Sequence, residues 1–464
     1  MKKILPLLLF FVFATLAAEK SEHVFYKKMP KAYRYRVYLA DKKNNSYSLK
    51  KPEAFLSEKS LARRKRLGIK LDKHDLPVSS SYLQELQAKG LRIHCVSKWN
   101  NTVVVEMSDT LQVEALKHLS FVTGIRKVWE SKDSVFCHQG FSRSSIIENK
   151  RDTLENYYGK GYKQISQLAA DDLHKAGYCG QGMTIAVIDG GFFNVDSIAA
   201  FRHTKILGTR NFVNPDKSVY EELQPHGTMV LGCIAPNGPY SHVGTAPEAS
   251  FYLLQSEDTS SEQPIEEDNW CAAVEYADSL GVDIVTSSLG YTTFDKGYDS
   301  HKYFEADGKT AVNSRVASLA ASRGILLLNS AGNEGDGTWK KIGFPADAPN
   351  ILTVGAVDYE GVNTIFSSLG NTADGRIKPE VMAVGAGTWV VNAQGNLEQS
   401  HGTSFSCPVL CGAVACLWQA FPEKTPLEII SAVVRSANNY EHPDNVYGYG
   451  IPNMWKAYNL LKKQ

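Results

Sequence analysis

The chain has almost no excess of charge of either sign. It holds 50 Lys and Arg against 49 Asp and Glu, a formal net charge of +1 over 464 residues. Proteins that bind nucleic acid or anionic membranes through their overall field are strongly basic, so we expect neither partner. The one dense basic run, RRKR at residues 63–66, lies in a helical pattern. We interpret it as a solvated helix face.

Long apolar runs are also scarce. Two lysines precede an apolar stretch over residues 4–16, and Ala17 and Ala18 follow it, which is the pattern of a signal peptide. About a dozen apolar residues are too few for a transmembrane helix, which needs about 20. We therefore predict that residues 1–18 are removed and that the mature chain has no membrane span. It would be exported, either secreted or held in the periplasm or cell envelope; an uncleaved anchor is the alternative.

Metal-binding patterns are missing too. The sequence has no Cys-x-x-Cys pair and no His-Glu-x-x-His pattern, so zinc has little support and we expect no required cofactor. Eight cysteines are present, and export would permit disulfides, but their pairing cannot be read from the sequence. Cys407, Cys411 and Cys416 share one apolar helix, where we expect buried thiols.

The most informative feature that is present is a serine at the start of an apolar helix. Ser404 lies in the segment HGTSFSCP, residues 401–408, which runs into apolar sequence as far as Phe421. Thr403 can cap a helix that begins at the serine, so backbone N–H groups would converge on the hydroxyl. A serine alkoxide and an anionic intermediate are stable there. His401 is interpreted as a surface or loop histidine.

Two other stretches supply what a nucleophilic serine needs. An apolar strand over residues 185–188 ends at Asp189, and His226 begins a helical segment. A serine hydroxyl is a poor nucleophile unless a base takes its proton. His226 would be that base and then the acid for the leaving amine, while Asp189 would orient the imidazole. We predict a catalytic triad of Asp189, His226 and Ser404.

Further motifs resemble one known family. The segments SAGNEG (residues 330–335) and SSLG (287–290), with residues 344–357 and 366–380, look like those of subtilisin. The chain order Asp, His, Ser is also the subtilisin order. The chain therefore resembles subtilisin-like serine peptidases over roughly residues 158–464.

The resemblance implies an activity and a site. The substrate would be a protein or peptide, cleaved through an acyl-enzyme intermediate. The side-chain amide of Asn333 and the backbone N–H of Ser404 would bind the oxyanion. Relatives often bind structural calcium, but no residue pattern identifies its ligands here. Ser288, Leu289 and Gly290 would line the substrate-binding cleft.

The expected fold of this part is α/β. Short apolar strands are predicted over residues 184–188, 250–255, 283–287, 325–329 and 351–354, with helices over 265–280 and 311–323. This alternation predicts a parallel sheet with helices on both faces. Catalytic residues would then lie at the carboxyl ends of strands, where Asp189 and Asn333 fall.

A separate unit precedes the peptidase part. Residues 19–134 mix predicted strands (34–39, 91–99, 102–107, 125–129) with helices (53–66, 79–89, 111–119), which indicates a small α+β unit with an antiparallel sheet. Its position resembles a peptidase prodomain, an intramolecular inhibitor; an unrelated binding domain is the alternative. Residues 135–157 are a polar linker expected to hold the processing site, and residues 158–464 form the peptidase domain.

Two departures from the family pattern bear on activity. Gly190 follows Asp189 where threonine or serine is usual, and Phe405 and Ser406 replace methionine and alanine. Neither change removes a reacting group. The sequence thus predicts a secreted serine endopeptidase made as a zymogen. The alternatives are a catalytically silent subtilisin-like binding scaffold and a zinc hydrolase that uses His226 and Asp189.

Overall fold

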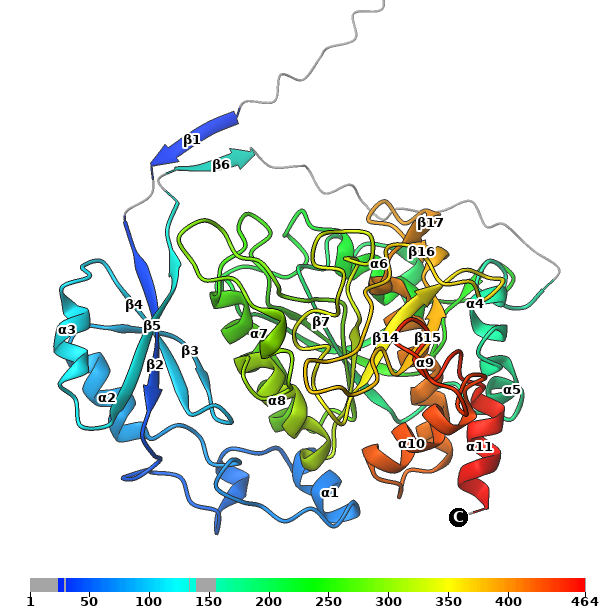
Figure 1. The fold of residues 1–464 in the computed structure, drawn as a ribbon, viewed down its shortest axis with the longest axis horizontal. Helices are drawn as coiled ribbons and strands as arrows, with labels where there is room; N and C mark the ends of the chain where they lie inside the picture. Colours follow the sequence, from blue (N-terminus) through cyan, green and yellow to red (C-terminus); the bar gives the residue numbers. More distant parts are fainter. Residues whose placement is uncertain (1–23, 29–30, 133, 139–155, 464) are drawn as a thin grey trace, which may run out of the picture.

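The computed structural model describes residues 24–28, 31–132, 134–138 and 156–463 (Figure 1). The predicted signal peptide and most of the predicted linker lie outside these residues. Two units are visible, a smaller one built from the first third of the chain and a larger one built from the rest.

The larger unit is built on a parallel sheet of seven strands, in the order β15-β14-β13-β12-β7-β11-β8. Five strands match the predicted ones to within a few residues, and two at the edges were not predicted. All but β8 are almost wholly buried, as expected where helices cover both faces. The bounds are β7 (Thr184–Asp189), β8 (Lys205–Asn211), β11 (Ser250–Gln255), β12 (Ile284–Ser287), β13 (Leu326–Ser330), β14 (Leu352–Val357) and β15 (Val381–Val384).

Alternate residues of β7, an inner strand of the sheet, pack into two cores. Ile185 and Val187 of β7 pack with α6 (His226–Ile234) and α9 (Thr403–Ala420) on one face. Ala186 and Ile188 pack with α7 (Ile265–Leu280) and α8 (Val312–Ala320) on the other. The predicted α/β fold with helices on both faces is confirmed.

Helix α9 has a composition that resembles a membrane span. Within the described residues it is the one helix long and apolar enough to cross a bilayer, yet 83% of it is buried inside the protein. It is the central helix of its core. Around it lie shorter elements: α4 (Tyr162–Ser166), α5 (Ala170–Lys175), α10 (Pro426–Ser436), α11 (Met454–Lys462), β9 (Asn237–Gly238), β10 (His242–Val243), β16 (Ala386–Val391) and β17 (Leu397–His401).

The smaller unit is a four-stranded antiparallel sheet in the order β3-β4-β2-β5. Two helices, α2 and α3, cover one face through Leu86 and Leu116, so the predicted architecture is confirmed. Asn101, with φ of 54°, lies in the turn between β3 and β4. The elements are β2 (Tyr33–Leu39), α2 (Ser80–Ala88), β3 (Arg92–Ser97), β4 (Thr102–Met107), α3 (Gln112–Lys117) and β5 (Val122–Glu130).

Two predictions for this region need correction. The helix expected over residues 53–66 is a short 3₁₀ turn, Pro52–Ala54, followed by α1 (Glu58–Arg66). The start of the expected linker forms a strand, β6 (Ser134–His138), which pairs antiparallel with β1 (Val24–Lys28). Sequence patterns near residue 134 could not indicate β6, because its partner lies more than a hundred residues away.

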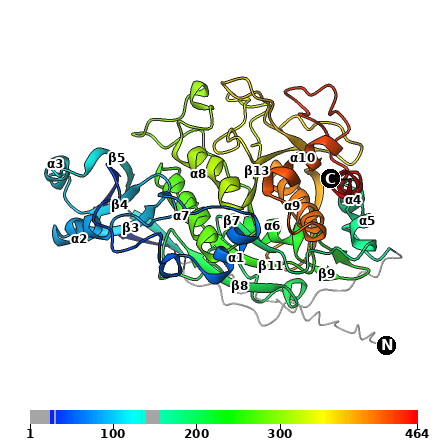
Figure 2. The same cartoon turned by 90° about the horizontal axis from the view of Figure 1, so that it is seen from below.

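The open face of the small sheet packs on α7 (Figures 1 and 2). The buried guanidinium of Arg36, on β2, binds both carboxylate oxygens of Asp268 at 2.6 and 2.7 Å. Val104 and Val128 contact Ile265 at the start of the helix. A bidentate arginine–carboxylate pair fixes orientation as well as contact, so α7 is the docking helix of the small unit.

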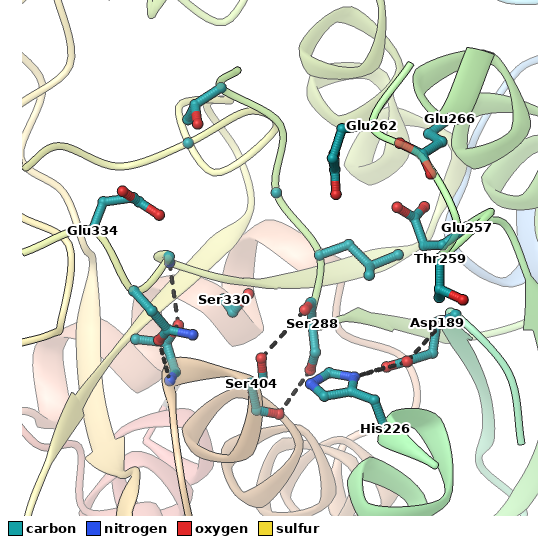
Figure 3. Close-up of a pocket in the computed structure, with 18 of the residues that line it drawn as sticks. Asp189, His226, Glu257, Thr259, Glu262, Glu266, Ser288, Ser330, Glu334 and Ser404 are labelled. Atoms are coloured by element: carbon teal, nitrogen blue, oxygen red, sulfur yellow. Dashed lines mark hydrogen bonds and ion pairs between the residues drawn. The ribbon is translucent and has the colours of Figure 1, made fainter. Parts of the chain in front are cut away.

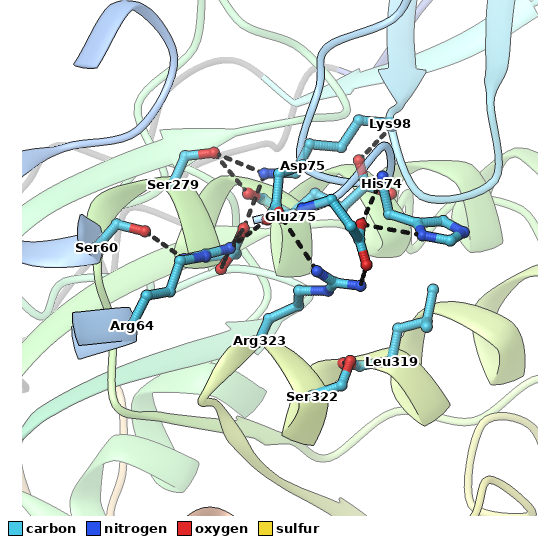
Figure 4. A network of polar contacts seen from close by, with 12 residues as sticks. Ser60, Arg64, His74, Asp75, Lys98, Glu275, Ser279, Leu319, Ser322 and Arg323 are labelled. Carbon is cyan, nitrogen blue, oxygen red and sulfur yellow. Dashed lines mark hydrogen bonds and ion pairs between the residues drawn. The ribbon is translucent and has the colours of Figure 1, made fainter. Parts of the chain in front are cut away.

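The basic run at residues 63–66 belongs to this interface, and the prediction of a solvated face is wrong for half of it. Arg63 and Arg64 are each only 2% exposed. Both bind the Asp278 carboxylate, at 2.6 and 2.9 Å, and Lys98 binds it at 2.8 Å. Arg64 also binds Asp75 at 2.7 Å (Figure 4). Burial would raise the pKa of Asp278, but these three cations hold it well below its usual value. The two arginines of α1 are thus buried because they bind a carboxylate on α7, about 200 residues further along the chain.

Candidate active site

The sheet brings all the predicted site residues to one edge. Asp189 ends β7, and Asn333 lies just beyond the end of β13, both at carboxyl ends of parallel strands, where ligands bind in such sheets. His226 and Ser404 lie in the first turns of α6 and α9. One cleft of about 430 Å³ is lined by Asp189, His226, Ser288, Leu289, Gly290, Asn333 and Ser404 (Figure 3).

A carboxylate–imidazole pair occupies one side of this cleft. The Nδ1 atom of His226 lies 2.8 and 3.0 Å from the two carboxylate oxygens of Asp189, which is fully buried. The Gly190 N–H donates to Asp189 at 2.8 Å. A backbone donor therefore serves the carboxylate where the family pattern has a hydroxyl side chain.

The electrostatic surroundings raise the proton affinity of this imidazole. Burial lowers the pKa of His226, but the charge and the hydrogen bond of Asp189, with the charge of Glu257, outweigh burial and raise it above its ordinary value. The ring of Phe405 lies 5.8 Å from the imidazole ring. An imidazole held in this way through Nδ1 presents Nε2 as the atom that exchanges protons.

Ser404 lies near the start of α9 and is 8% exposed. Its hydroxyl donates to the Ser288 carbonyl at 3.4 Å, and the Ser288 hydroxyl donates to the Ser404 carbonyl at 2.8 Å. Pro408, one turn on, has no N–H to offer that carbonyl, so Ser288 supplies the missing donor. The first turn of α9 is therefore tied to the segment after β12.

The predicted cap of this helix is wrong. The helix already includes Thr403, and Gly402, with φ of 146°, is the residue before it. The Thr403 hydroxyl is engaged elsewhere, donating to the Asn333 side-chain oxygen at 2.9 Å, which the Thr403 N–H also reaches at 2.9 Å. Because both bonds use the oxygen of the Asn333 amide, its N–H₂ donors remain for the cleft.

Sequence reasoning missed a row of acidic residues in the same cleft. Glu257, Glu262 and Glu266 line it opposite Glu334 (Figure 3). The available signal was the density of acids in SEDTSSEQPIEED, residues 256–268, directly after a strand whose carboxyl end faces the site.

Neither a metal centre nor a disulfide is found in the described part of the chain. No group of three or more His, Cys, Asp or Glu side chains there could hold a metal ion. Cys407, Cys411 and Cys416 are free and buried, as predicted. Burial raises the pKa of Cys407 to about 12, so its thiol is protonated and unreactive near neutral pH. His401 is exposed on β17, and His242 is buried with Nε2 at 3.0 Å from the Gly232 carbonyl.

Comparisons with known proteins agree with this geometry. Residues 180–450 match the subtilase family, and residues 34–139 match the peptidase S8 propeptide domain of Bacteroidota. Subtilisin NAT of Bacillus subtilis subsp. natto and subtilisin E of Bacillus subtilis are each 31% identical over 317 residues, 68% of this chain and 75% of theirs. The subtilisin of Bacillus pumilus is 30% identical over 296 residues, 63% of this chain and 97% of its own.

A solved structure extends the likeness to both units. The epidermin leader peptide processing serine protease of Staphylococcus aureus superposes with a TM-score of 0.64 and 16% identity, covering 93% of this chain and 99% of that one. At this identity the likeness concerns the fold.

Proposed function

This chain is a serine endopeptidase of the subtilase family, and we propose that it acts through a triad of Asp189, His226 and Ser404 and an acyl-enzyme intermediate. The observation that carries the proposal is the buried Asp189–His226 pair, at 2.8 Å, in one cleft with a serine in the first turn of α9. An oriented base beside a helix N-terminus is the arrangement that activates a hydroxyl.

The proposed reaction follows from the roles of these atoms. The Ser404 oxygen attacks the scissile carbonyl while His226 Nε2 takes its proton, and Asp189 stabilises the imidazolium. The oxyanion accepts hydrogen bonds from the Asn333 N–H₂ group and the Ser404 N–H. His226 then gives the proton to the leaving amine, and water attacks the acyl-enzyme by the same route.

Substrate binding would also free the nucleophile. The Ser404 hydroxyl donates to the Ser288 carbonyl through a long bond of 3.4 Å, which is weak and easily exchanged. A peptide strand that lies along Ser288, Leu289 and Gly290 would donate its own N–H to that carbonyl. The Ser404 hydroxyl would then turn to His226 as the substrate arrives.

We also propose that the protein is exported as a zymogen. Residues 1–18 would be the signal peptide, residues 19–134 the inhibitory prodomain, and residues 135–157 the segment that holds the processing site. The match of residues 34–139 to a propeptide domain supports this. So does the backbone of Glu130 at the end of β5, which exchanges hydrogen bonds of 2.9 and 3.3 Å with the Gln263 side chain beside the cleft.

The test is to replace the nucleophile alone. Ser404→Ala should abolish hydrolysis of a protein substrate, because the variant lacks only the attacking oxygen, and it should leave circular dichroism and the melting temperature unchanged. A fluorophosphonate probe should label the wild type and not the variant. Wild-type turnover by Ser404→Ala would refute the triad.

A further inference from the structure

One wall of the cleft gathers carboxyl groups with no cation among them. Glu257 follows β11, Glu262 lies just before α7, and Glu266 lies in the first turn of α7 (Figure 3). The described residues that line the cleft include no Lys and no Arg. Glu266 is buried, Glu257 is half-buried and Glu262 is exposed. A buried carboxylate is stable when it is paired with a cation, and Glu266 has no such partner among the described residues of this wall.

The lack of a cationic partner is clearest at Glu266. Its side chain is 1% exposed, and Oε1 accepts the Asp258 N–H at 3.1 Å. Within the described part of the chain, no amide, hydroxyl or cationic group donates to Oε2. The Glu266 side chain instead contacts the carboxyl of Glu262, with which it shares a hydrogen bond when one of the two is protonated. The next two residues of α7 differ: Glu267 binds His301 at 2.8 Å and Asp268 binds Arg36 at 2.6 Å. A pair of carboxyls without a cation on the cleft side, one of them buried, is what a bound cation would satisfy.

The raised pKa values of the carboxyl groups in this wall are what is expected where no cation is present to stabilise their ionised forms. Burial raises the pKa of Glu266 to about 11, and the charges of Glu257, Glu262 and Asp258 add to the effect. Burial raises the pKa of Glu257 to about 7, although Tyr291 and Ser256 donate hydrogen bonds to it. An entering cation would replace the protons on these carboxyls and remove the mutual repulsion of their ionised forms.

The prodomain shows which side of the scissile bond this wall serves. Its last strand, β5, ends beside Gln263, between Glu262 and α7. In any cleavage that releases the prodomain, its residues lie on the N-terminal side of the cut bond. The loop that carries the acidic residues therefore contacts the part of the substrate that precedes the scissile bond.

We propose that Glu257 and Glu266 form a subsite for a Lys or Arg side chain on the N-terminal side of the scissile bond. The ligand is an ammonium or guanidinium group, because the described carboxyls include no cluster with the geometry of a metal site. Its N–H donors would reach Glu266 Oε2, while the aliphatic stem lies along the cleft. The inference rests on the proposed function and assigns the substrate class of that same site.

The first experiment compares matched peptides. The full chain is expressed and allowed to mature, and kcat/KM is measured for peptides with Lys or norleucine at each of the positions before the scissile bond. At one position Lys should be favoured by at least about 10-fold, the value of a charge-assisted hydrogen bond. Glu266→Gln keeps the shape and the bond to Asp258 and should bring that ratio close to 1.

Two further variants make the result specific. Glu257→Gln should also reduce the ratio, and it serves if Glu266→Gln fails to fold. Glu334→Gln removes a carboxylate from the opposite wall of the same cleft and should keep the preference. Equal rates for Lys and norleucine at every position, or an equal loss of preference in Glu334→Gln, would overturn the subsite.

A binding measurement separates this inference from the proposed mechanism. Ser404→Ala, freed of its prodomain by wild-type enzyme added in trans and then purified, should bind the Lys peptide at least about 10-fold more tightly than its norleucine twin by fluorescence anisotropy, because recognition does not need the nucleophile. If the proposed triad is wrong but the subsite is right, fluorophosphonate will not label the wild-type protein, and the protein will still bind the Lys peptide more tightly. Labelled, active enzyme with equal affinity for both peptides would refute the subsite alone.

Discussion

Asn333 joins two tasks in one side chain. Its oxygen accepts both hydrogen bonds from Thr403 and so positions the start of α9. Its N–H₂ group is left free of these bonds, and in the proposed mechanism it binds the oxyanion. We expect Asn333→Leu to lower kcat by about 10²- to 10³-fold with little change in KM, because the donor acts mainly in the transition state.

Asn333→Asp separates the two tasks. It retains the acceptors for Thr403 but has no donor for the oxyanion, so kcat should fall at least as far while the melting temperature stays at that of the wild type. Steady-state kinetics and thermal unfolding, measured side by side, give the answer. If both variants bound a peptide aldehyde and its ground-state analogue with the same proportional loss, Asn333 would be a structural residue only.

The pH dependence of activity follows from His226. Its pKa is raised above the ordinary value of about 6.5, and only the neutral imidazole accepts the proton of Ser404. The value of kcat/KM should therefore fall as the pH drops through this raised pKa. Glu257→Gln removes one of the charges that raise it, so the acid limb should move to lower pH.

A control is available in the same cleft. Glu334 does not contribute to the shift at His226, so Glu334→Gln should leave the acid limb in place. Profiles of kcat/KM from pH 5 to 9 for the three proteins suffice. An acid limb at the same pH in Glu257→Gln would show that Glu257 does not influence the imidazole.

At the scale of elements, the sequence predicted the interior of the molecule better than its edges. The central strands are continuous apolar runs because both their faces are covered. β8 was missed because it is a half-exposed edge strand whose KILGTRN sequence mixes polar and apolar residues, and β15 is only four residues long. The residues of the proposed triad could be picked out from the sequence because each lies at the end of a recognisable element.

Long-range partners explain the remaining errors. The arginines of α1 have their carboxylate on α7, and Thr403 has its acceptor on the segment after β13. The sequence shows that the segment around Glu266 is rich in acidic residues. That these residues line the cleft follows only from the order of the strands in the sheet. Local patterns cannot report either kind of pairing.

Helices α1 and α7 are joined through Asp278, and its charge should control docking of the prodomain. Asp278→Asn leaves Arg63, Arg64 and Lys98 without their shared anion on docking. Breaking such a buried pair costs about 3–5 kcal/mol. The inhibition constant of the separate prodomain should therefore rise by about 10²-fold or more.

The control for Asp278→Asn is a variant that loses one negative charge outside the interface with the prodomain. Glu398→Gln, on the exposed β17 strand, should leave the inhibition constant unchanged. Inhibition assays on the matured variants, with one preparation of prodomain, provide the measurement. Equal inhibition of Asp278→Asn and wild type would show that the charged network contributes nothing to docking.

At the scale of the whole molecule, the two units should act on each other when separate. Residues 19–132, added to the matured enzyme, should inhibit it, because the end of β5 lies at the rim of the cleft. The same fragment should speed refolding of the peptidase unit if docking on α7 stabilises its transition state, since parallel sheets assemble slowly from distant segments.

A matched fragment tests whether docking is specific. Arg36→Ala removes the bidentate contact to Asp268, so it should inhibit much more weakly than the wild-type fragment. Titration of activity with the two fragments distinguishes them. A wild-type fragment that leaves hydrolysis unchanged at micromolar concentration would remove the prodomain role.

The order of the site along the chain has a consequence for biosynthesis. β7, which carries Asp189, is an inner strand of the sheet, whereas Ser404 lies on α9, encoded after every strand of that sheet. A polypeptide that emerges from the ribosome amino end first therefore exposes α7 and the prodomain long before Ser404 is made. In the proposed mechanism, nascent chains and chains truncated before residue 403 therefore have no peptidase activity.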